Sequence, residues 1–111
     1  MIAVTEAVLS EMAAAIVRAV DPEQVYLFGS RARNQATQDA DVDLLIVERG
    51  RFDEPRSRLR ELRRIRRAVS AFRVPKDILV YSSEEVARWR HSANHIISRC
   101  LREGRLLYAR S

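Results

Sequence analysis

The sequence of 111 residues predicts an α/β fold, more narrowly α+β, in which a small mixed β-sheet is packed with helices in the order α-β-α-β-α-β-α-α. Three stretches repeat apolar residues every three or four positions, as amphipathic helices do, and short continuous apolar runs of strand length lie between them. One such run ends at Gly-Ser and another follows an Asp-Val-Asp triplet. A chain of this length holds one core, so we expect a single domain over residues 1–111.

The first helix is predicted over Ile2–Val20. Its apolar face consists of Val8, Leu9, Met12 and Ile16. Asp21 and Pro22 should end this helix, because proline cannot continue a helical hydrogen-bond ladder. The first strand is then expected to begin near Gln24 and to carry the apolar run Val25–Phe28.

A Gly-Ser pair and an Asp-x-Asp pair frame the segment after this strand. Gly29 permits a sharp turn, and the short helix that begins there would direct its free N–H groups, with the Ser30 hydroxyl, toward an anion. Ten residues separate Ser30 from Asp41. Asp41 and Asp43 leave the same face of a strand, and the apolar run Val42–Val47 indicates a strand buried on both faces. The two carboxylates would repel each other there, which favours a hard cation with oxygen ligands. The alternative is an acidic turn that caps a helix or pairs with nearby arginines.

The motif Gly-Ser-Arg-Ala-Arg, followed by Asp-Val-Asp-Leu-Leu-Ile-Val, resembles the minimal nucleotidyltransferases, small members of the DNA polymerase beta-like superfamily. Some members are antitoxins that pair with HEPN ribonuclease toxins. The resemblance covers nearly the whole chain and implies the polymerase beta-like nucleotidyltransferase fold. It implies AMP transfer from ATP to a hydroxyl, with a tyrosine of a HEPN toxin as the acceptor. It also implies that Asp41 and Asp43 ligate two Mg²⁺ ions and that Gly29 and Ser30 bind the triphosphate.

Two positions depart from this family pattern. Asn34 occupies a position where glycine is common, and Ala40 a position where serine or threonine often precedes the first aspartate. Asparagine tolerates left-handed backbone, so we expect the turn to be kept. Arg31 and Arg33 differ by two positions and cannot reach one phosphate together from a helix, so one of them could pair with an aspartate instead. We assign phosphate contact to Arg31.

Asp77 is the candidate third carboxylate. It lies near the start of a predicted strand over Val74–Tyr81, so an acid again precedes an apolar run. The resemblance implies that this acid ligates the catalytic metal or takes the proton from the attacking hydroxyl. A solvent-facing aspartate paired with Lys76 is the alternative. Asp39 forms a second Asp-x-Asp with Asp41, but outside the family spacing, and is interpreted as a turn residue.

A basic helix is predicted from Glu54 or Pro55 to Phe72. Its apolar stripe consists of Leu59, Leu62, Ile65, Val69 and Phe72. The arginines Arg56, Arg60, Arg63, Arg64 and Arg67 fall within an arc of about 100° on a helical wheel. This face could be solvated, or it could bind RNA or an acidic partner. No aromatic residue interleaves with these arginines, so base stacking is not indicated.

The C-terminal part predicts two short helices. Ser82 and Glu85 have the spacing of a capping box, and Ser92 is predicted to cap the last helix, which Gly104 ends. The inner face of that helix is assigned to Ile96, Ile97, Cys100 and Leu101, and Leu106–Tyr108 could add a short strand or a docking tail. Trp89 is assigned to the rim of the core. His91 and His95 lack a third ligand nearby and are interpreted as surface or structural histidines.

Composition sets the remaining expectations. A net charge of +5 fits a nucleoside triphosphate or RNA, an acidic partner, or solubility alone. The sequence has no apolar run of membrane length and no evident signal peptide, and it has a single cysteine, so we expect a cytoplasmic protein without a membrane partner. A minimal catalytic core has no separate substrate domain, so we expect a partner protein or a second copy of the chain to help recognise the acceptor. The alternatives are an inert antitoxin that neutralises by binding, or transfer to an RNA or small-molecule hydroxyl.

Overall fold

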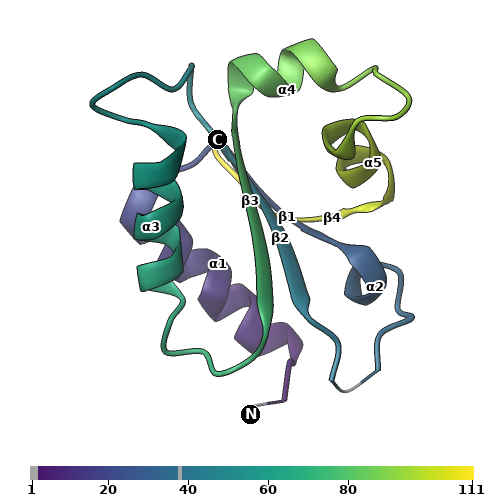
Figure 1. Ribbon diagram of the computed structural model, residues 1–111. Helices are drawn as coiled ribbons and strands as arrows, with labels where there is room; N and C mark the ends of the chain where they lie inside the picture. The colour runs from purple at the N-terminus through teal and green to yellow at the C-terminus, as the bar shows by residue number, and fades with distance from the viewer. Residues whose placement is uncertain (1–2, 38) are drawn as a thin grey trace.

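A computed structural model describes residues 3–37 and 39–111, in which a four-stranded mixed sheet is covered by helices on both faces (Figure 1). The elements in chain order are α1 (Glu6–Val20), β1 (Gln24–Phe28), α2 (Gly29–Ala32), β2 (Val42–Glu48), α3 (Arg58–Ala68), β3 (Lys76–Ser82), α4 (Ser83–Trp89), α5 (Ile96–Glu103) and β4 (Arg105–Ala109). The predicted fold class and element order are confirmed, and Leu106–Tyr108 belongs to a fourth strand. No helix among the described residues has the length and apolar character needed to cross a bilayer.

The sheet has the strand order β3-β2-β1-β4. β1 runs antiparallel to both β2 and β4, whereas β2 and β3 run parallel. In this register Asp43 lies beside Phe28 of β1 on one side and beside Asp77 of β3 on the other. The starts of β2 and β3 therefore meet the end of β1 at one end of the sheet.

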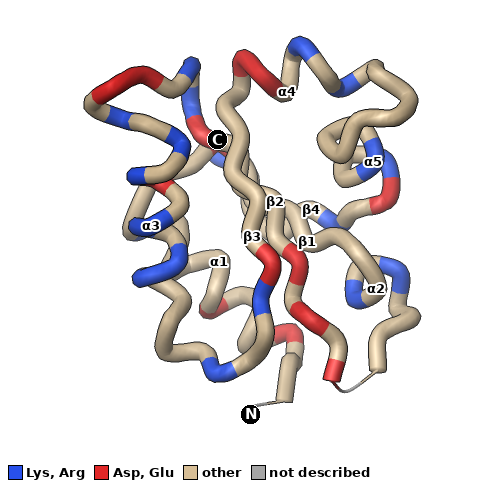
Figure 2. The backbone as a smooth tube through the Cα atoms, in the orientation of Figure 1, with Lys and Arg blue, Asp and Glu red and all other residues tan. Residues whose placement is uncertain are grey.

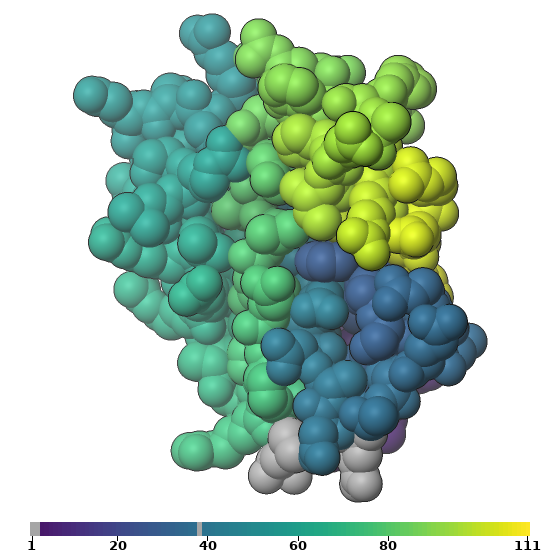
Figure 3. Space-filling model, turned by 45° about the vertical axis from the view of Figure 1, so that its right-hand side comes forward, coloured from purple at the N-terminus to yellow at the C-terminus, as the bar shows by residue number. Residues whose placement is uncertain are grey.

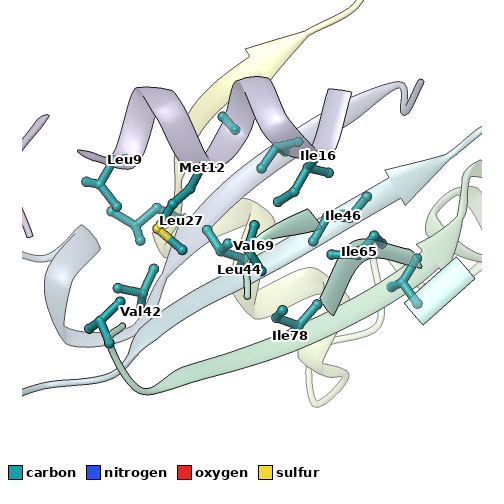
Figure 4. Packing of buried hydrophobic residues seen from close by; sticks show 14 residues of the cluster. Leu9, Met12, Ile16, Leu27, Val42, Leu44, Ile46, Ile65, Val69 and Ile78 are labelled. Carbon is teal, nitrogen blue, oxygen red and sulfur yellow. The ribbon is translucent and has the colours of Figure 1, made fainter. Parts of the chain in front are cut away.

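Each face of β2 packs on a different set of helices. Its even-numbered residues Val42, Leu44 and Ile46 join the core under α1 and α3, together with Met12 and Ile65 (Figure 4). Leu45 and Val47 belong to a second cluster, with Val86 of α4 and with Ile97 and Cys100 of α5. Both faces of β2 are buried, as predicted. Because side chains alternate along a strand, Asp43 shares the face of Leu45, which α5 covers.

The N-terminal helix ends as predicted and begins later than predicted. Thr5 caps α1 by accepting a hydrogen bond from the Val8 N–H at 3.1 Å. The predicted start at Ile2 lies outside the described residues. Asp21 takes a left-handed backbone conformation with φ of 48° and closes the helix with a hydrogen bond to the Val17 carbonyl.

The predicted bounds of the basic helix are wrong at both ends. Helix α3 begins at Arg58 and is capped by Ser57, because the preceding residues form a turn in which Asp53 accepts from the Arg56 N–H at 2.9 Å. Leu59 was assigned to the buried stripe, yet its side chain is 55% exposed. At 100° per residue, Leu59 lies about 120° from the buried Ile65 and Glu61 only about 40°. Glu61 therefore takes the inward position and is 1% exposed.

The C-terminal helices differ in their caps. Ser82 and Glu85 form the predicted capping box of α4. Ser92 does not cap α5: its N–H donates to the Trp89 carbonyl and prolongs the turn after α4. His95 is the cap instead, because its Nδ1 accepts from the Ile97 N–H at 3.1 Å. The His95 ring stacks on Trp89 at 4.8 Å between centroids, so this histidine has a structural role.

A buried pair of glutamates joins α3 to the far end of β2. Glu48 and Glu61 are each 1% exposed, and the Glu48 carboxyl accepts from Arg56 through Oε1 at 3.3 Å. Its Oε2 has no donor among the described residues. Burial, a hydrogen bond to Glu61 and the charge of Glu61 raise the pKa of Glu48 to about 8. A proton shared with Glu61 would give Oε2 a partner, and the pH dependence of a Glu48→Gln variant tests this.

We expect Glu48→Gln to stabilise the protein increasingly as the pH rises. Between the ordinary glutamate pKa of 4.5 and about 8, the unfolded chain loses the Glu48 proton while the folded chain keeps it, so wild-type stability falls with pH. Glutamine removes this fall and can still donate to Glu61. Urea unfolding at pH 5 and pH 8 should show a gain on the order of 2 kcal/mol for the variant at the higher pH. Exposed Glu54→Gln is the control, and parallel curves for wild type and Glu48→Gln would contradict the shared proton.

Candidate active site

Three aspartates gather at the end of the sheet where β2 and β3 begin. Asp43 and Asp77 are direct partners across the parallel pair, so their side chains leave the same face of the sheet. Asp41 lies just before β2, two residues from Asp43, at the same end. Acidic segments lie side by side at the starts of these two strands in Figure 2. Asp43 and Asp77 therefore share the face of the sheet on which α4 and α5 pack.

The pKa of Asp43, the most buried of the three aspartates, is raised. Burial raises the pKa of Asp43 above its ordinary value, and the charges of Asp77 and then Asp41 raise it further, while Arg31 and Arg33 act in the opposite direction. Asp41 and Asp77 are exposed and Asp43 is half-buried. The site therefore carries more negative charge than its own arginines neutralise.

Carboxylate oxygens are the ligands that Mg²⁺ prefers, and a cation here would relieve the repulsion that raises the pKa of Asp43. The donor set thus fits a divalent cation in its chemistry. Within residues 3–37 and 39–111, however, no three Asp, Glu, His or Cys side chains are placed to hold one ion. Binding of the cation would require the exposed Asp41 and Asp77 side chains to turn toward Asp43.

Gly29 allows the turn after β1 to pass close to Asp43. Its φ is +73°, a conformation that side chains disfavour, and a Cβ atom built there would lie 2.2 Å from Asp43 Oδ2. Helix α2 begins at this glycine and ends at Ala32. Asn34 has a φ of 56°, so asparagine keeps the left-handed turn, as predicted. The Ser30 carbonyl accepts from the Gln35 N–H at 2.9 Å and closes the turn.

The two arginines of the motif lie in different places. The Arg31 guanidinium donates to the Ala40 carbonyl from Nε at 3.1 Å and from Nη2 at 2.7 Å, and so holds the loop that leads to Asp41. Arg33 lies beyond the end of the short helix, where its Nε donates to Gln35 at 3.0 Å. The helical spacing that was expected to keep Arg31 and Arg33 from reaching one phosphate does not apply, because the helix ends at Ala32, between them.

A cavity of about 320 Å³ opens beside Asp43. The turn and β2 contribute Phe28, Gly29, Ser30, Arg33 and Asp43 to its lining, and α5 contributes Ile96, Arg99, Cys100 and Glu103. Helix α5 and the segment after β1 border each other on the surface in Figure 3. Sequence analysis did not place α5 or Arg33 in the site. Nothing in the local pattern links Arg99 to Asp43, 56 positions earlier, because tertiary packing brings them together.

Asp39, His91 and the arginines of α3, which the sequence also singled out, do not line this cavity. Asp39 lies in an exposed turn, as predicted, and His91 is exposed in the turn after α4, so it does not share a helical face with His95. Cys100 is buried in the second core cluster, and burial raises the pKa of its thiol to about 11. The exposed arginines of α3 lie on the side of the sheet opposite α5 (Figure 2).

This chain is similar to known proteins in sequence and in fold. The family model described as "Nucleotidyltransferase domain" matches residues 9–106. No curated protein sequence matches the chain. Among solved structures, a candidate nucleotidyltransferase from Sulfolobus solfataricus is similar, with 24% identity, a TM-score of 0.60, and coverage of 95% of this chain and 84% of that one.

Two further similar structures are toxin–antitoxin proteins. One was solved with AMP-PNP and has 16% identity, a TM-score of 0.59, and coverage of 92% of this chain and 74% of that one. The other is a mutant of the MntA-HpeT pair, with 13% identity, a TM-score of 0.59, and coverage of 97% and 75%. At these identities the likeness establishes the shared fold.

Proposed function

Because this chain belongs to the family of nucleotidyltransferase domains, we propose that it transfers AMP from ATP to a tyrosine hydroxyl of a HEPN-type toxin and so acts as an antitoxin. The observation that carries the proposal is the alignment of Asp43 with Asp77 across two parallel strands, where Asp43 also lies beside the Gly29 turn and lines a cavity of about 320 Å³. Toxin–antitoxin proteins share the fold, and one of them was solved with an ATP analogue.

Nucleotide binding is assigned to the turn and the three acids. The N–H groups of Gly29 and Ser30 and the Ser30 hydroxyl would bind the triphosphate, and Arg31 would add positive charge next to it. Asp41, Asp43 and Asp77 would hold Mg²⁺, two ions in the proposed complex. Bound Mg²⁺ neutralises the triphosphate and lowers the pKa of the acceptor hydroxyl.

The chemical step is an in-line displacement at the α-phosphorus. The acceptor oxygen forms a bond to this phosphorus while the bond to the bridging oxygen breaks, and pyrophosphate leaves with that electron pair. We assign to Asp77 the role of general base, which takes the proton from the acceptor hydroxyl. Asp77 is exposed and lies on the edge strand β3, where a partner can approach. Asp43 is more enclosed and serves as a ligand. The carboxylates hold and orient groups and do not attack phosphorus.

Acceptor recognition is assigned to a partner protein, in a hetero-oligomer. The cavity beside Asp43, at about 320 Å³, leaves little room for an acceptor once a triphosphate is bound. The acceptor hydroxyl must therefore come from outside the cavity, and another protein could present it over the edge of β3. An RNA acceptor that used the arginines of α3 would have to pass around that edge, because α3 covers the other face.

The test is transfer of label from α-³²P-ATP, with Mg²⁺, to a purified HEPN-type toxin that this chain neutralises. We expect a labelled toxin, loss of the label when the acceptor tyrosine is changed to phenylalanine, and no labelling without Mg²⁺. Toxin that is neutralised without becoming labelled would support binding alone as the antitoxin mechanism. Label that appears on RNA or on a small molecule, independently of the toxin, would reassign the acceptor.

Arg31→Lys is expected to lower the transfer rate about tenfold at a nearly unchanged KM for ATP. Lysine keeps a positive charge near the phosphates but cannot make two hydrogen bonds to the Ala40 carbonyl, so the loop before Asp41 loosens. Initial rates at varied ATP concentration separate kcat from KM. A rise in KM at constant kcat would instead assign Arg31 mainly to phosphate contact.

A further inference from the structure

Helix α5 supplies a second positive charge to the cavity beside Asp43. Arg99 lines the cavity together with Arg33 from the turn, so two cations from separate elements border one space. Ile96 and Arg99 also line an adjoining hollow of about 260 Å³ next to the loop between α4 and α5. Arg99 therefore borders both spaces and can direct its guanidinium into either.

The present partner of Arg99 is a weak one. Its Nε donates to Glu103 Oε2 at 3.0 Å, one helical turn along α5, and the two side chains are 64% and 38% exposed. An exposed pair of this kind contributes little stability, because water screens both charges. A polyphosphate in the cavity offers several oxygens to the planar guanidinium and would compete well with one solvated carboxylate.

The rest of the α5 wall favours an anion held close to Asp43. Ile96 and the buried Cys100 form its apolar part, which displaces water from this side of the cavity. The charges of Asp43, Arg99 and Glu103 all influence the Cys100 thiol, which places α5 within electrostatic range of the acid cluster. A negatively charged ligand there needs cations to offset Asp43, and Arg33 and Arg99 are the two that line the cavity.

We propose that Arg99 binds the triphosphate of the incoming nucleotide and that this contact replaces its ion pair with Glu103. The inference rests on the proposed function, since the ligand is the nucleotide of the same site. Arg99 thereby acts as a substrate-binding residue supplied by the C-terminal helix, and Glu103 competes with the nucleotide for its guanidinium. The two side chains are thus expected to affect nucleotide binding in opposite directions.

The test is equilibrium binding of two probes in the presence of Mg²⁺, a non-hydrolysable ATP analogue and inorganic tripolyphosphate. We expect Arg99→Ala to weaken binding of both probes about tenfold, because a hydrogen-bonded charge is lost from a partly exposed site. Glu103→Gln should tighten binding of both about two- to threefold, because it frees Arg99 from its partner. Arg99→Lys, which keeps the charge without the planar fork, should fall between Arg99→Ala and wild type.

Arg102→Ala is the matched control. Arg102 lies on the same helix, carries the same charge and donates to Ser98 at 3.2 Å, but it does not line the cavity. Wild-type affinity in Arg99→Ala, or an equal loss in Arg102→Ala, would overturn the inference. If wild type itself binds neither probe, the proposed nucleotidyltransferase function is contradicted, and with it the role of Arg99. Thermal unfolding without ligand shows whether Arg99→Ala is folded. If it is not, the affinities of Arg99→Lys and Glu103→Gln test the inference in its place.

Discussion

Asp43→Asn is expected to lower AMP transfer by roughly a thousandfold or more, because the amide removes a charged metal ligand from the centre of the site. The folded protein should nevertheless be at least as stable as wild type at neutral pH. Burial and the neighbouring acids raise the pKa of Asp43, so its ionised form is disfavoured in the folded state. Asparagine removes that cost. Rates from labelled ATP and melting temperatures on the same preparation measure both effects.

The pH dependence gives the stability effect a definite sign. Below the ordinary aspartate pKa of 3.8, the carboxyl is protonated in the folded and unfolded chain alike, so the advantage of Asp43→Asn should vanish there. As the pH rises above the raised folded-state pKa, the advantage should reach its full value. A variant that is less stable than wild type at pH 7 would contradict this account of the acid cluster.

Asp39→Asn is the matched control for Asp43→Asn. Asp39 lies four residues earlier in an exposed turn and has the same charge. We expect its amide variant to retain transfer within about twofold, because exposed surface substitutions are usually near neutral. Toxin neutralisation distinguishes the two antitoxin mechanisms: Asp43→Asn should lose it if AMP transfer is required and keep it if binding alone suffices. Equal loss of transfer in both variants would indicate that net charge, and not the ligand set, matters.

The part of the site that follows from local chemistry could be predicted from the sequence. The turn could be placed because Gly29 follows the end of a strand, and the first two carboxylates because Asp41 and Asp43 stand at the start of the next one. Both depend only on residues that are close in the sequence. The repeated pattern of an acid before an apolar run made Asp77 the candidate third carboxylate, but the parallel pairing of β2 with β3 that sets it beside Asp43 was not predicted. The fold class followed from the same patterns.

What could not be predicted depends on contacts between distant elements. Arg99 reaches the cavity because α5 packs on the face of β2 that carries Leu45, and no spacing in the sequence encodes that contact. The sequence pattern did not single out Glu61, although its position on the helical wheel places it inward, where burial and the neighbouring Glu61 raise the pKa of Glu48. A glutamate at an inward position signals an unusual buried pair only after its partner strand is known.

The basic face of α3 illustrates the limit of charge patterns. The exposed Arg63, Arg66 and Arg67 have no ion-pair partner among the described residues, but they lie across the sheet from the acids. Their number therefore gives no support for a direct role in nucleotidyl transfer. Arg56 was grouped with them, yet it lies before the helix and binds the Glu48 carboxyl and the Arg51 carbonyl.

Gly29→Ala is expected to reduce transfer by roughly a hundredfold, because a small displacement of a catalytic group has effects of this size. The added Cβ would lie 2.2 Å from Asp43 Oδ2, closer than atoms can approach, so the turn or the carboxylate must move. The positive φ adds backbone strain of about 1 kcal/mol. Stability should thus fall modestly while activity falls sharply, as measured by urea unfolding and by transfer rates on the same protein.

Gly50→Ala is the control that separates the effect of backbone strain from the effect of displacing Asp43. Gly50 has nearly the same φ, +66°, but the nearest atom to its added Cβ is Arg56 Nη2 at 3.7 Å, an ordinary contact, at the end of β2 remote from the acids. Its alanine variant should lose about the same backbone stability as Gly29→Ala and keep full transfer activity. If the two variants lost activity equally, general destabilisation would explain the loss. A difference of about two orders of magnitude would assign it to the contact between the turn and Asp43, on which the proposed nucleotide site depends.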